Sequence, residues 1–593
     1  MISALRSTSF YRALKRWRAL FRRTRFYQTL RLFTIPIRRT RSYQTIKHSW
    51  QLVRNSEYRS SNRKARGDFR EFCNQYGGSA LRHDLRPRKS KLKTALIIRN
   101  VTLPYASMEG FVKKALEMAG FETVVVGHRR YDFLRYDWLT GNKTVIELDD
   151  FGTEGDPDWV AQQVGTLESM HDWLALEYRG VHVGRFVIAM AQRRYRGRLD
   201  FADPVIQEDL RRQLAVSVRH TIAATRMIQK MKPDCVLVMD RGYTGQGEVF
   251  DLAINQGIDT LVWNLGYKSN RIVFKRYNLG NERDHHLCPS ADSWRRICSI
   301  PWNPENGNRI RQELFDCYQT QDWFSLVGAQ YDKKILSQAT TREKLGLSSD
   351  KKVAVIFPHI LWDGSFFWGK DIFSDYTHWL VETIRAAAAN PRLQWVVKLH
   401  PAHLVKIKQM NDAVRPLEFD VIERTVGNLP DHVKLVHPDT ELSTYSLFQI
   451  ADYTVTVRGT VGIESGLFGV PVVTAGTGRY DRRGFTLDSS TREEYLQKLA
   501  TLETYPRLSA EQVELAERYA YGVFIGRPLS LSSLSLAYAR DGKATPKVTV
   551  HCQTREQWLG SPDMQKLTAW ISDGKLEDML ELPLPETPES LTA

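Results

Sequence analysis

Hydrophobic positions from residue 91 onward alternate between short β-branched runs and amphipathic stretches. "TALIIR" (94–99), "SMEGFVKKALEMAG" (107–120) and "FETVVVG" (121–127) follow one another directly. An apolar run, a glycine-ended helical pattern and a second apolar run are typical of a βαβ unit with parallel strands. A first α/β domain is therefore predicted to begin near residue 91.

The same pattern returns twice along the chain. "CVLVMD" (235–240), "GEVFDLAINQG" (247–257) and "DTLVWN" (259–264) follow a less regular helical region. A second series starts with "KKVAVIFPHI" (351–360), continues through a helix (376–390), two strands (393–401 and 432–438) and a helix (443–451), and reaches "TVTVRGTVGIESGLFGVPVVTAG" (454–476). Two doubly wound, Rossmann-like α/β domains are predicted.

Composition shifts divide the chain into six predicted segments. They are a basic amphipathic helical extension (1–66), a linker (67–90), an N-terminal Rossmann-like domain with a helical insertion (91–300), an inter-domain passage (301–350), a C-terminal Rossmann-like domain (351–540) and a C-terminal tail (541–593). The end of the tail, "ELPLPETPES", is acidic and proline-rich, which predicts disorder.

The net charge of +17 resides in the first segment, because residues 1–66 hold 18 Lys or Arg and one acid, Glu57. "RRTRFYQTLRLF" (22–33) is echoed by "RRTRSYQTIKHS" (38–49), with aromatic and aliphatic residues at helical spacing among the arginines. Such helices bind an anionic membrane surface, pack on the protein or a partner, or bind nucleic acid. Nucleic acid is disfavoured, because the rest of the chain is charge-balanced.

The chain lacks an apolar run of the ~18 residues that a membrane-spanning helix needs and the apolar block of a signal peptide. A cytoplasmic protein, peripheral at the inner face of the membrane, is predicted. The six cysteines are scattered without a CxxC pair, which predicts reduced thiols and neither a zinc site nor a disulfide framework; they are Cys73, Cys235, Cys288, Cys298, Cys317 and Cys552.

Polar residues gather where predicted strands end, at the edge that faces the ligand crevice in open α/β sheets. In "VRGTVGIESGLFG", Arg458 ends a strand, Gly459 allows close approach and Thr460 begins a helix whose free N–H groups attract anions. Glu464, on the first turn, either accepts hydrogen bonds from ribose hydroxyls or merely complements the helix dipole. This junction suits a nucleotide phosphate.

The strand "WVVKLHP" ends in Lys398, His400 and Pro401. His400 could donate to a phosphate or carboxylate, or protonate a departing nucleotide, although a histidine–proline pair is also common in loops.

A carboxylate at the ligand crevice can act as a base or as a nucleophile in group transfer, and Asp240 and Asp363 are the candidates. Asp240 is favoured if the donor binds the second domain, with capping of the "RGYTG" turn as its alternative role. The aromatic residues beside Asp363 either line a sugar or base pocket or pack between the domains; they are Trp362, Phe366, Phe367 and Trp368.

The order "LWDGSFFWGKD", "WVVKLHPAH", "VRGTVGIESGLFGVPVV" resembles the capsule polysaccharide biosynthesis family, which includes the capsule Kdo transferases. The resemblance implies a GT-B-like fold of two facing domains, a nucleotide-activated sugar donor, no cofactor and no metal. In that family and the similar sialyltransferase-like enzymes, the His-Pro pair contacts the donor phosphate and a helix-start hydroxyl assists. These roles would fall on His400, Pro401 and Thr460. A CMP-linked acidic sugar, favoured over a UDP-linked one, would place its carboxylate near Arg458 and Lys398.

The sequence thus predicts a glycosyltransferase of surface or capsular polysaccharide biosynthesis, which transfers a sugar such as Kdo to a lipid-linked or growing glycan. A sugar-nucleotide 2-epimerase-like enzyme on the same scaffold is one alternative. A non-catalytic scaffold in polysaccharide assembly or export is the other. No nucleic-acid partner is expected.

Overall fold

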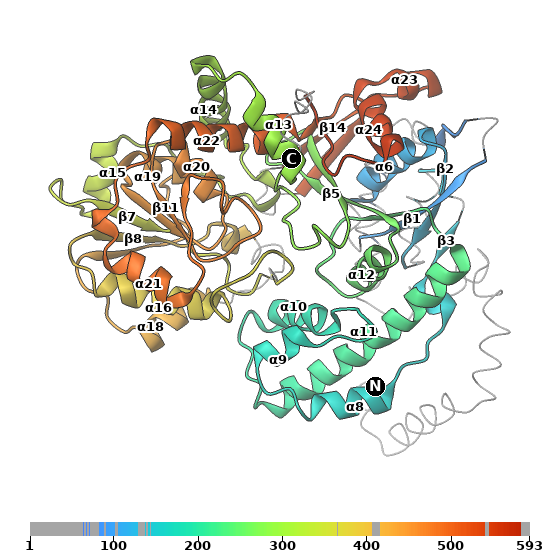
Figure 1. The fold of residues 1–593 in the computed structure, drawn as a ribbon, viewed down its shortest axis with the longest axis horizontal. Helices are drawn as coiled ribbons and strands as arrows, with labels where there is room; N and C mark the ends of the chain where they lie inside the picture. Colours follow the sequence, from blue (N-terminus) through green and yellow to red (C-terminus); the bar gives the residue numbers. More distant parts are fainter. Residues whose placement is uncertain are drawn as a thin grey trace.

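The computed structural model describes residues 82–87, 91–100, 105–128, 140–142, 144–363, 366–405, 415–539 and 545–582, and residues 63, 67, 70 and 137 individually. The basic extension (1–66) therefore lies, except for Arg63, outside the described residues. Two α/β domains stand side by side, as predicted, each built on its own sheet (Figure 1). In the described part of the chain, no helix is long and apolar enough to cross a membrane.

The first sheet has the strand order β13-β6-β5-β4-β1-β2-β3. Its strands are β1 (Lys93–Ile98), β2 (Phe121–Val126), β3 (Val145–Ile146), β4 (Cys235–Val238), β5 (Asp259–Leu265), β6 (Arg271–Tyr277) and β13 (Leu529–Ser530). Strands β1 to β5 pair in parallel, whereas β6 pairs antiparallel with both β5 and β13. The order reverses between β1 and β4, which makes this point a topological switch point.

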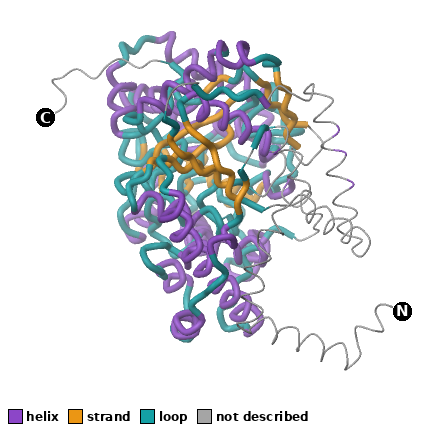
Figure 2. Tube along the Cα trace, turned by 90° about the vertical axis from the view of Figure 1, so that its right-hand side faces the viewer, coloured by secondary structure: helices purple, strands orange, loops and turns teal. Residues whose placement is uncertain are grey.

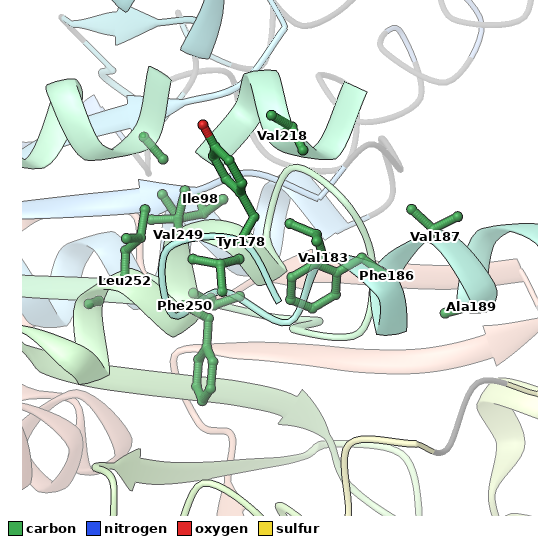
Figure 3. Packing of buried hydrophobic residues seen from close by; sticks show 14 of the residues in the cluster. Ile98, Tyr178, Val183, Phe186, Val187, Ala189, Val218, Val249, Phe250 and Leu252 are labelled. Atoms are coloured by element: carbon green, nitrogen blue, oxygen red, sulfur yellow. The ribbon is translucent and has the colours of Figure 1, made fainter. Parts of the chain in front are cut away.

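Successive residues of β1 point to opposite faces of this sheet, as the twofold period of a strand requires. Ala95 and Ile97 pack with helices α6 (Ala106–Met118) and α24 (Pro562–Asp573). Leu96 and Ile98 pack with α10 (Val183–Tyr195), α11 (Pro204–Met231) and α12 (Gly247–Asn255), as Figure 3 shows for part of this cluster. The sheet is therefore covered on both faces, as a parallel sheet must be.

The predicted helical insertion consists of α8 (Pro157–Val164), α9 (Met170–Ala175), α10 and α11, which form one layer below the first sheet (Figure 1). Helix α11 begins with Asp203, whose side chain accepts from the Val205 N–H, and with Pro204 at its first position. Both features favour a helix start.

The second sheet is parallel throughout, with the order β12-β11-β10-β7-β8-β9. Its strands are β7 (Val353–Ile356), β8 (Gln394–Lys398), β9 (Val433–Val436), β10 (Tyr453–Thr456), β11 (Val472–Thr474) and β12 (Thr486–Leu487), and its helices include α16 (Tyr376–Ala388), α18 (Leu417–Thr425), α19 (Thr444–Ile450), α20 (Val461–Gly466), α21 (Arg492–Ala500) and α22 (Ala510–Tyr521). Strands lie between helices in the perpendicular view as well (Figure 2). The switch point of this sheet is between β7 and β10.

The inter-domain passage (301–350) is more ordered than its polar composition suggests. It contains α14 (Pro304–Gln319) and α15 (Gln338–Leu345). Ile310 and Leu314 of α14 are buried in one cluster with Val353 and Val355 of β7. The passage is thus part of the second domain's core.

The predicted boundary at residue 540 also differs from the structure. After α22 the chain returns to the first domain, where β13 joins the edge of the first sheet and α23 (Arg555–Gly560) and α24 cover its face. Figure 1 shows α24 beside α6, although the two are more than 400 residues apart. Residues 545–582 are therefore a structural part of the first domain and not a tail.

Candidate functional site

A cavity of about 450 Å³ lies between the two sheets and is lined by both domains. The carboxyl ends of β4, β7, β8 and β10 reach it, so it occupies the switch points of both sheets, where α/β folds bind ligands. All the site residues predicted from sequence line this one cavity: Asp240, Asp363, Lys398, His400, Pro401, Arg458, Gly459, Thr460 and Glu464.

The turn between β10 and α20 is packed closely against its surroundings. A Cβ atom on Gly459 would lie 3.0 Å from the Thr456 Oγ1 atom, and the Gly459 carbonyl accepts from the Tyr480 hydroxyl at 2.7 Å. A side chain here would push the turn away from the sheet. Helix α20 spans six residues, so anion binding would depend on local donors rather than on a long helix dipole.

Arg458 is held differently from the prediction. Its guanidinium donates to the carbonyl oxygens of Trp368 at 2.7 Å and Lys370 at 3.3 Å, and it pairs with the Asp371 carboxylate. The side chain is 3% exposed. Arg458 therefore fixes the segment 366–371 against the strand edge, and its charge is partly neutralised by Asp371.

Glu464 is almost completely buried, at 1% exposure, and lines the cavity. Tyr318 donates to its Oε2 atom, whereas Oε1 lacks a hydrogen-bond partner of good geometry among the described residues. Burial raises the pKa of Glu464 to about 7, although hydrogen bonds from Tyr318 and Thr460 act in the opposite direction. Glu464 can thus accept or donate a hydrogen bond at neutral pH.

Lys398 is the last residue of β8 and is 3% exposed. Its ammonium donates to the Leu399 carbonyl at 3.2 Å. Burial, together with the nearby charge of Lys333, lowers the pKa of Lys398 to about 7. An anion in the cavity would restore the charged form.

His400 and Pro401 follow on the turn after β8. The His400 Nδ1 atom accepts from the Ala402 N–H at 3.2 Å, which leaves the proton of the neutral ring on Nε2. The Pro401 carbonyl accepts from the Leu404 N–H at 3.1 Å. This turn thus presents His400 at the cavity as a hydrogen-bond donor.

Asp240 and Asp363 approach the cavity from different domains. The Asp240 carboxylate accepts from the Gly242 N–H at 3.1 Å, and burial and then the charge of Asp363 raise its pKa, whereas Arg193 lowers it. Asp363 is fixed through its own N–H, which donates to the Ile360 carbonyl at 3.0 Å. The two carboxylates therefore lie close enough for the charge of Asp363 to raise the pKa of Asp240.

The aromatic residues beside Asp363 combine the two roles considered from sequence. Phe367 stacks on Phe186 of α10 at 5.7 Å between ring centroids, and Trp362 lies under Arg196 at 5.2 Å. Phe367 and Trp368 also line the cavity. The domains are thus packed together by rings that form part of the cavity wall.

Sequence reasoning missed several cavity residues. His359 stands at the switch point after β7, where its Nε2 atom accepts from the Arg458 N–H at 3.4 Å and its ring stacks on Tyr376. Burial and neighbouring cations lower the pKa of His359 to about 3. The strand-end position of "FPHI" could have identified it. Arg193, His285, His286 and Arg479 also line the cavity and carry no local sequence signal.

Among the described residues, no group of three or more His, Cys, Asp or Glu side chains is arranged to hold a metal ion.

No family model matches this chain, and no curated protein does. Similar solved structures include the Thermosulfurimonas dismutans KpsC β-Kdo 2,4-transferase, with 14% identity, coverage of 53% of this chain and 84% of that chain, and a TM-score of 0.30. The Neisseria meningitidis UDP-GlcNAc 2-epimerase bound to UDP-GlcNAc has 13% identity, coverage of 72% and 97%, and a TM-score of 0.26. The Acinetobacter baumannii MurG has 11% identity, coverage of 72% and 95%, and a TM-score of 0.24.

Proposed function

We propose that this chain is a glycosyltransferase that takes a sugar from a nucleotide donor held on the second domain and passes it to an acceptor on the first. One observation carries the proposal: the strand-end residues of both sheets meet in one cavity that contains carboxylates, hydrogen-bond donors and buried cations. Transfer of a sugar from a phosphate leaving group requires such a base and such groups to stabilise the phosphate.

The second domain supplies the donor contacts. The buried Glu464 Oε1 atom is suited to accept from a ribose hydroxyl, because a ligand would satisfy it. His400, Lys398 and Thr460 lie along the same edge and are suited to a phosphate. When the bond between sugar and phosphate breaks, His400 stabilises or protonates the departing phosphate oxygen.

The first domain supplies the base. Asp240 takes the proton of the acceptor hydroxyl, whose oxygen then forms the new bond to the anomeric carbon. Burial raises the pKa of Asp240, which strengthens it as a base. Asp363 is the alternative base or nucleophile, from the opposite wall.

The finer assignment rests on the sequence motifs. They favour a CMP-linked acidic sugar such as Kdo and a lipid-linked or growing surface polysaccharide as acceptor. The basic extension (1–66) would keep the enzyme at an anionic membrane surface, where assembly or export proteins would also be found. No cofactor is required in this scheme.

Calorimetric titration of the full chain with CMP, UDP and GDP tests the donor site. One nucleotide is expected to bind, and His400→Ala is expected to weaken it at least tenfold, or ~1.4 kcal/mol. His437→Ala serves as the control, because His437 is half-exposed and lies outside the cavity. A wild-type chain that binds none of the nucleotides would favour the scaffold alternative.

Asp240→Asn and Asp363→Asn test the chemistry. With a CMP- or UDP-sugar that binds, the loss of the base is expected to slow transfer at least 100-fold while nucleotide affinity stays within threefold. Full transfer activity in both variants would remove the carboxylates from the mechanism. Reversible change at C2 of a bound UDP-sugar without an acceptor would instead favour the epimerase-like alternative.

A further inference from the structure

Three arginines hold the cavity wall formed by residues 366–371, and a fourth, Arg479, lies beside Arg458. Arg241 donates to the Phe367 carbonyl at 3.4 Å, and Arg283 donates to the Phe366 and Gly369 carbonyls, each at 3.1 Å. Arg458 donates to two further carbonyls and pairs with Asp371. Carbonyl oxygens satisfy the donors of these side chains but do not neutralise their charge. The wall therefore carries an excess of positive charge. Burial, and then the charges of neighbouring arginines, lower the pKa of Arg283 to about 10.

Arg479 differs from the other three, because it holds no part of this wall. It is 9% exposed and lines the cavity. In the described part of the chain, its side chain donates one hydrogen bond, from Nη1 to the Arg458 carbonyl at 3.0 Å, and its buried Nε has no acceptor. No carboxylate of the described residues lies within ion-pair distance of it.

A buried guanidinium in this condition is unfavourable for the free protein. Removing a cation from water costs several kcal/mol unless an anion compensates it, and Glu464, an acid whose charge acts on Arg479, has a pKa raised to about 7 by burial. The three arginines of the wall each donate to at least two carbonyl oxygens, and Arg458 also pairs with Asp371. Arg479 has neither an acid partner nor a second acceptor among the described residues. Such a cation at a cavity is instead typical of a site completed by an anionic ligand.

We propose that Arg479 binds the anionic group of the ligand, a phosphate or a carboxylate, and that Arg458 is a positioning residue that holds the segment 366–371. This inference rests on the proposed function for the identity of the ligand as a nucleotide sugar. It moves the main ion-pairing role from the arginine in the recognised motif to one 21 residues later.

Calorimetric titrations of the full chain with Arg479→Met, Arg479→Lys and Arg482→Met test this role. The probes are CMP, UDP, their nucleosides cytidine and uridine, inorganic pyrophosphate, and glucuronate as a sugar acid. Arg482→Met is the matched control, since it removes the same charge from an exposed residue three positions away. Arg479→Met is expected to weaken the nucleotide that wild type binds at least tenfold, leave its nucleoside within twofold, and keep the melting temperature equal or higher. Arg479→Lys is expected to be intermediate.

The outcomes separate the two proposals. Weakening confined to glucuronate would assign Arg479 to a carboxylate, and weakening of nucleotides and pyrophosphate would assign it to a phosphate. If wild type bound pyrophosphate or glucuronate through Arg479 but bound no nucleotide, this inference would stand and the proposed transferase function would be overturned. Wild-type nucleotide binding, with Arg479→Met leaving the affinities for nucleotide, pyrophosphate and glucuronate all unchanged, would retain the transferase and overturn this inference. A melting temperature lowered together with equal loss of nucleoside binding would show a structural role and overturn the inference, as would the absence of binding to every anion.

Discussion

At the scale of single residues, the cavity keeps groups whose charge opposes folding. Lys398 is buried and forms no ion pair among the described residues, and burial, followed by the charge of Lys333, lowers its pKa from 10.5 to about 7. The unfolded chain binds this proton more tightly than the folded protein does. Burial of Lys398 therefore destabilises the folded protein increasingly as pH falls from 10.5 to 7, and by a constant amount below pH 7. A buried residue that destabilises the folded protein in this way is expected where the residue binds a ligand.

Lys398→Met is therefore expected to stabilise the protein by a few kcal/mol at pH 6–7, with the gain fading as pH approaches 10.5. Melting temperatures of variant and wild type across that range measure it. Exposed Lys344→Met, which removes a surface pair with Glu441, should change little at any pH. A gain for Lys398→Met that is the same at pH 7 and pH 10.5 would contradict the assigned titration.

Glu464 allows a second test at this scale. If Oε1 accepts from a ribose hydroxyl, wild type should bind the ribonucleotide several-fold more tightly than its 2′-deoxy form, and Glu464→Gln should reduce that preference. The substitution keeps the shape of the side chain, so the melting temperature should hardly fall. If calorimetry showed the same ratio of ribonucleotide to 2′-deoxynucleotide affinity in wild type and in Glu464→Gln, Glu464 would have only a structural role, in its contact with Tyr318.

At the scale of elements, the loop that carries Asp240 is held by the helix that follows it. Glu248 of α12 is fully buried and accepts from the Ser217 and Thr244 hydroxyls and from the Gly245 N–H, each at 2.6 Å. One carboxylate thus joins the 240–247 loop to helix α11 of the insertion. We infer that the insertion positions the proposed base.

Glu248→Gln places an amide N–H₂ group against these donors and should cost about 1–3 kcal/mol of stability. Transfer should slow because Asp240 is displaced, whereas nucleotide affinity should persist because the donor site belongs to the other domain. Urea unfolding and titration measure the two effects. Glu208→Gln, in an exposed pair with Arg211, should stay within ~0.5 kcal/mol of wild type. If Glu248→Gln also lost nucleotide affinity, the donor site and the proposed base would not be held by separate parts of the structure.

Strands and helices whose own periodicity is strong were predictable. The predicted strand 94–99 corresponds to β1 (Lys93–Ile98) and the helix 376–390 to α16 (Tyr376–Ala388). Strand β6 was not recognised, since its sequence "RIVFKRY" places Lys275 and Arg276 at buried positions. These charges are compensated by Asp578 and Asp259, and the first of these partners lies 303 residues away. Local pattern cannot reveal such pairing.

The candidate site was likewise predictable where local sequence pattern determines the position of a residue, and not where tertiary partners do. Strand-end residues such as Asp240 and His400 could be found, because parallel strands bring their carboxyl ends to one edge. Whether an arginine is neutralised depends on tertiary partners. Arg458 and Arg479 look alike in sequence. In the structure Arg458 pairs with Asp371 and donates to two carbonyls of the segment 366–371, whereas Arg479 donates one hydrogen bond among the described residues.

At the scale of the whole molecule, the chain crosses between domains twice. Within the described residues, it leaves the first domain near α13 (Ala291–Ser299) and returns after α22. The contact between domains also includes the His285 N–H, which donates to the Gly478 carbonyl at 2.9 Å. Gly478 and Gly369 lie too close for a side chain on either one, because a Cβ atom on Gly369 would come within 1.9 Å of the Thr477 carbonyl oxygen. Gly369 and Gly478 both belong to the second domain, and the Gly369 N–H donates to the Arg283 carbonyl of the first domain at 2.7 Å, so backbone hydrogen bonds join the domains at this edge of the cavity.

The returning segment is predicted to be essential for the first domain to fold. A chain ended at residue 540 loses a set of buried core residues: Val548, Val550, Cys552, Trp558, Met564, Leu567, Trp570, Ile571 and Met579. At about 1.5–3 kcal/mol for each large side chain, the free energy lost with their burial is as large as the 5–15 kcal/mol that stabilises a typical domain. The loss of Asp578 also leaves Lys275 and Arg527 buried together without their shared carboxylate.

The chain ending at 540 should therefore be aggregated or rapidly degraded by trypsin, and it should bind neither nucleotide nor acceptor at the shared cavity. A chain ending at 582 keeps every described contact and is the control. Asp578→Asn, in the full chain, should lower stability by about 3–5 kcal/mol, because a buried ion pair is broken on one side. Size-exclusion chromatography and limited proteolysis distinguish these cases. A monodisperse, protease-resistant 1–540 chain would mean that α23 and α24 merely cover a domain that is already stable without them.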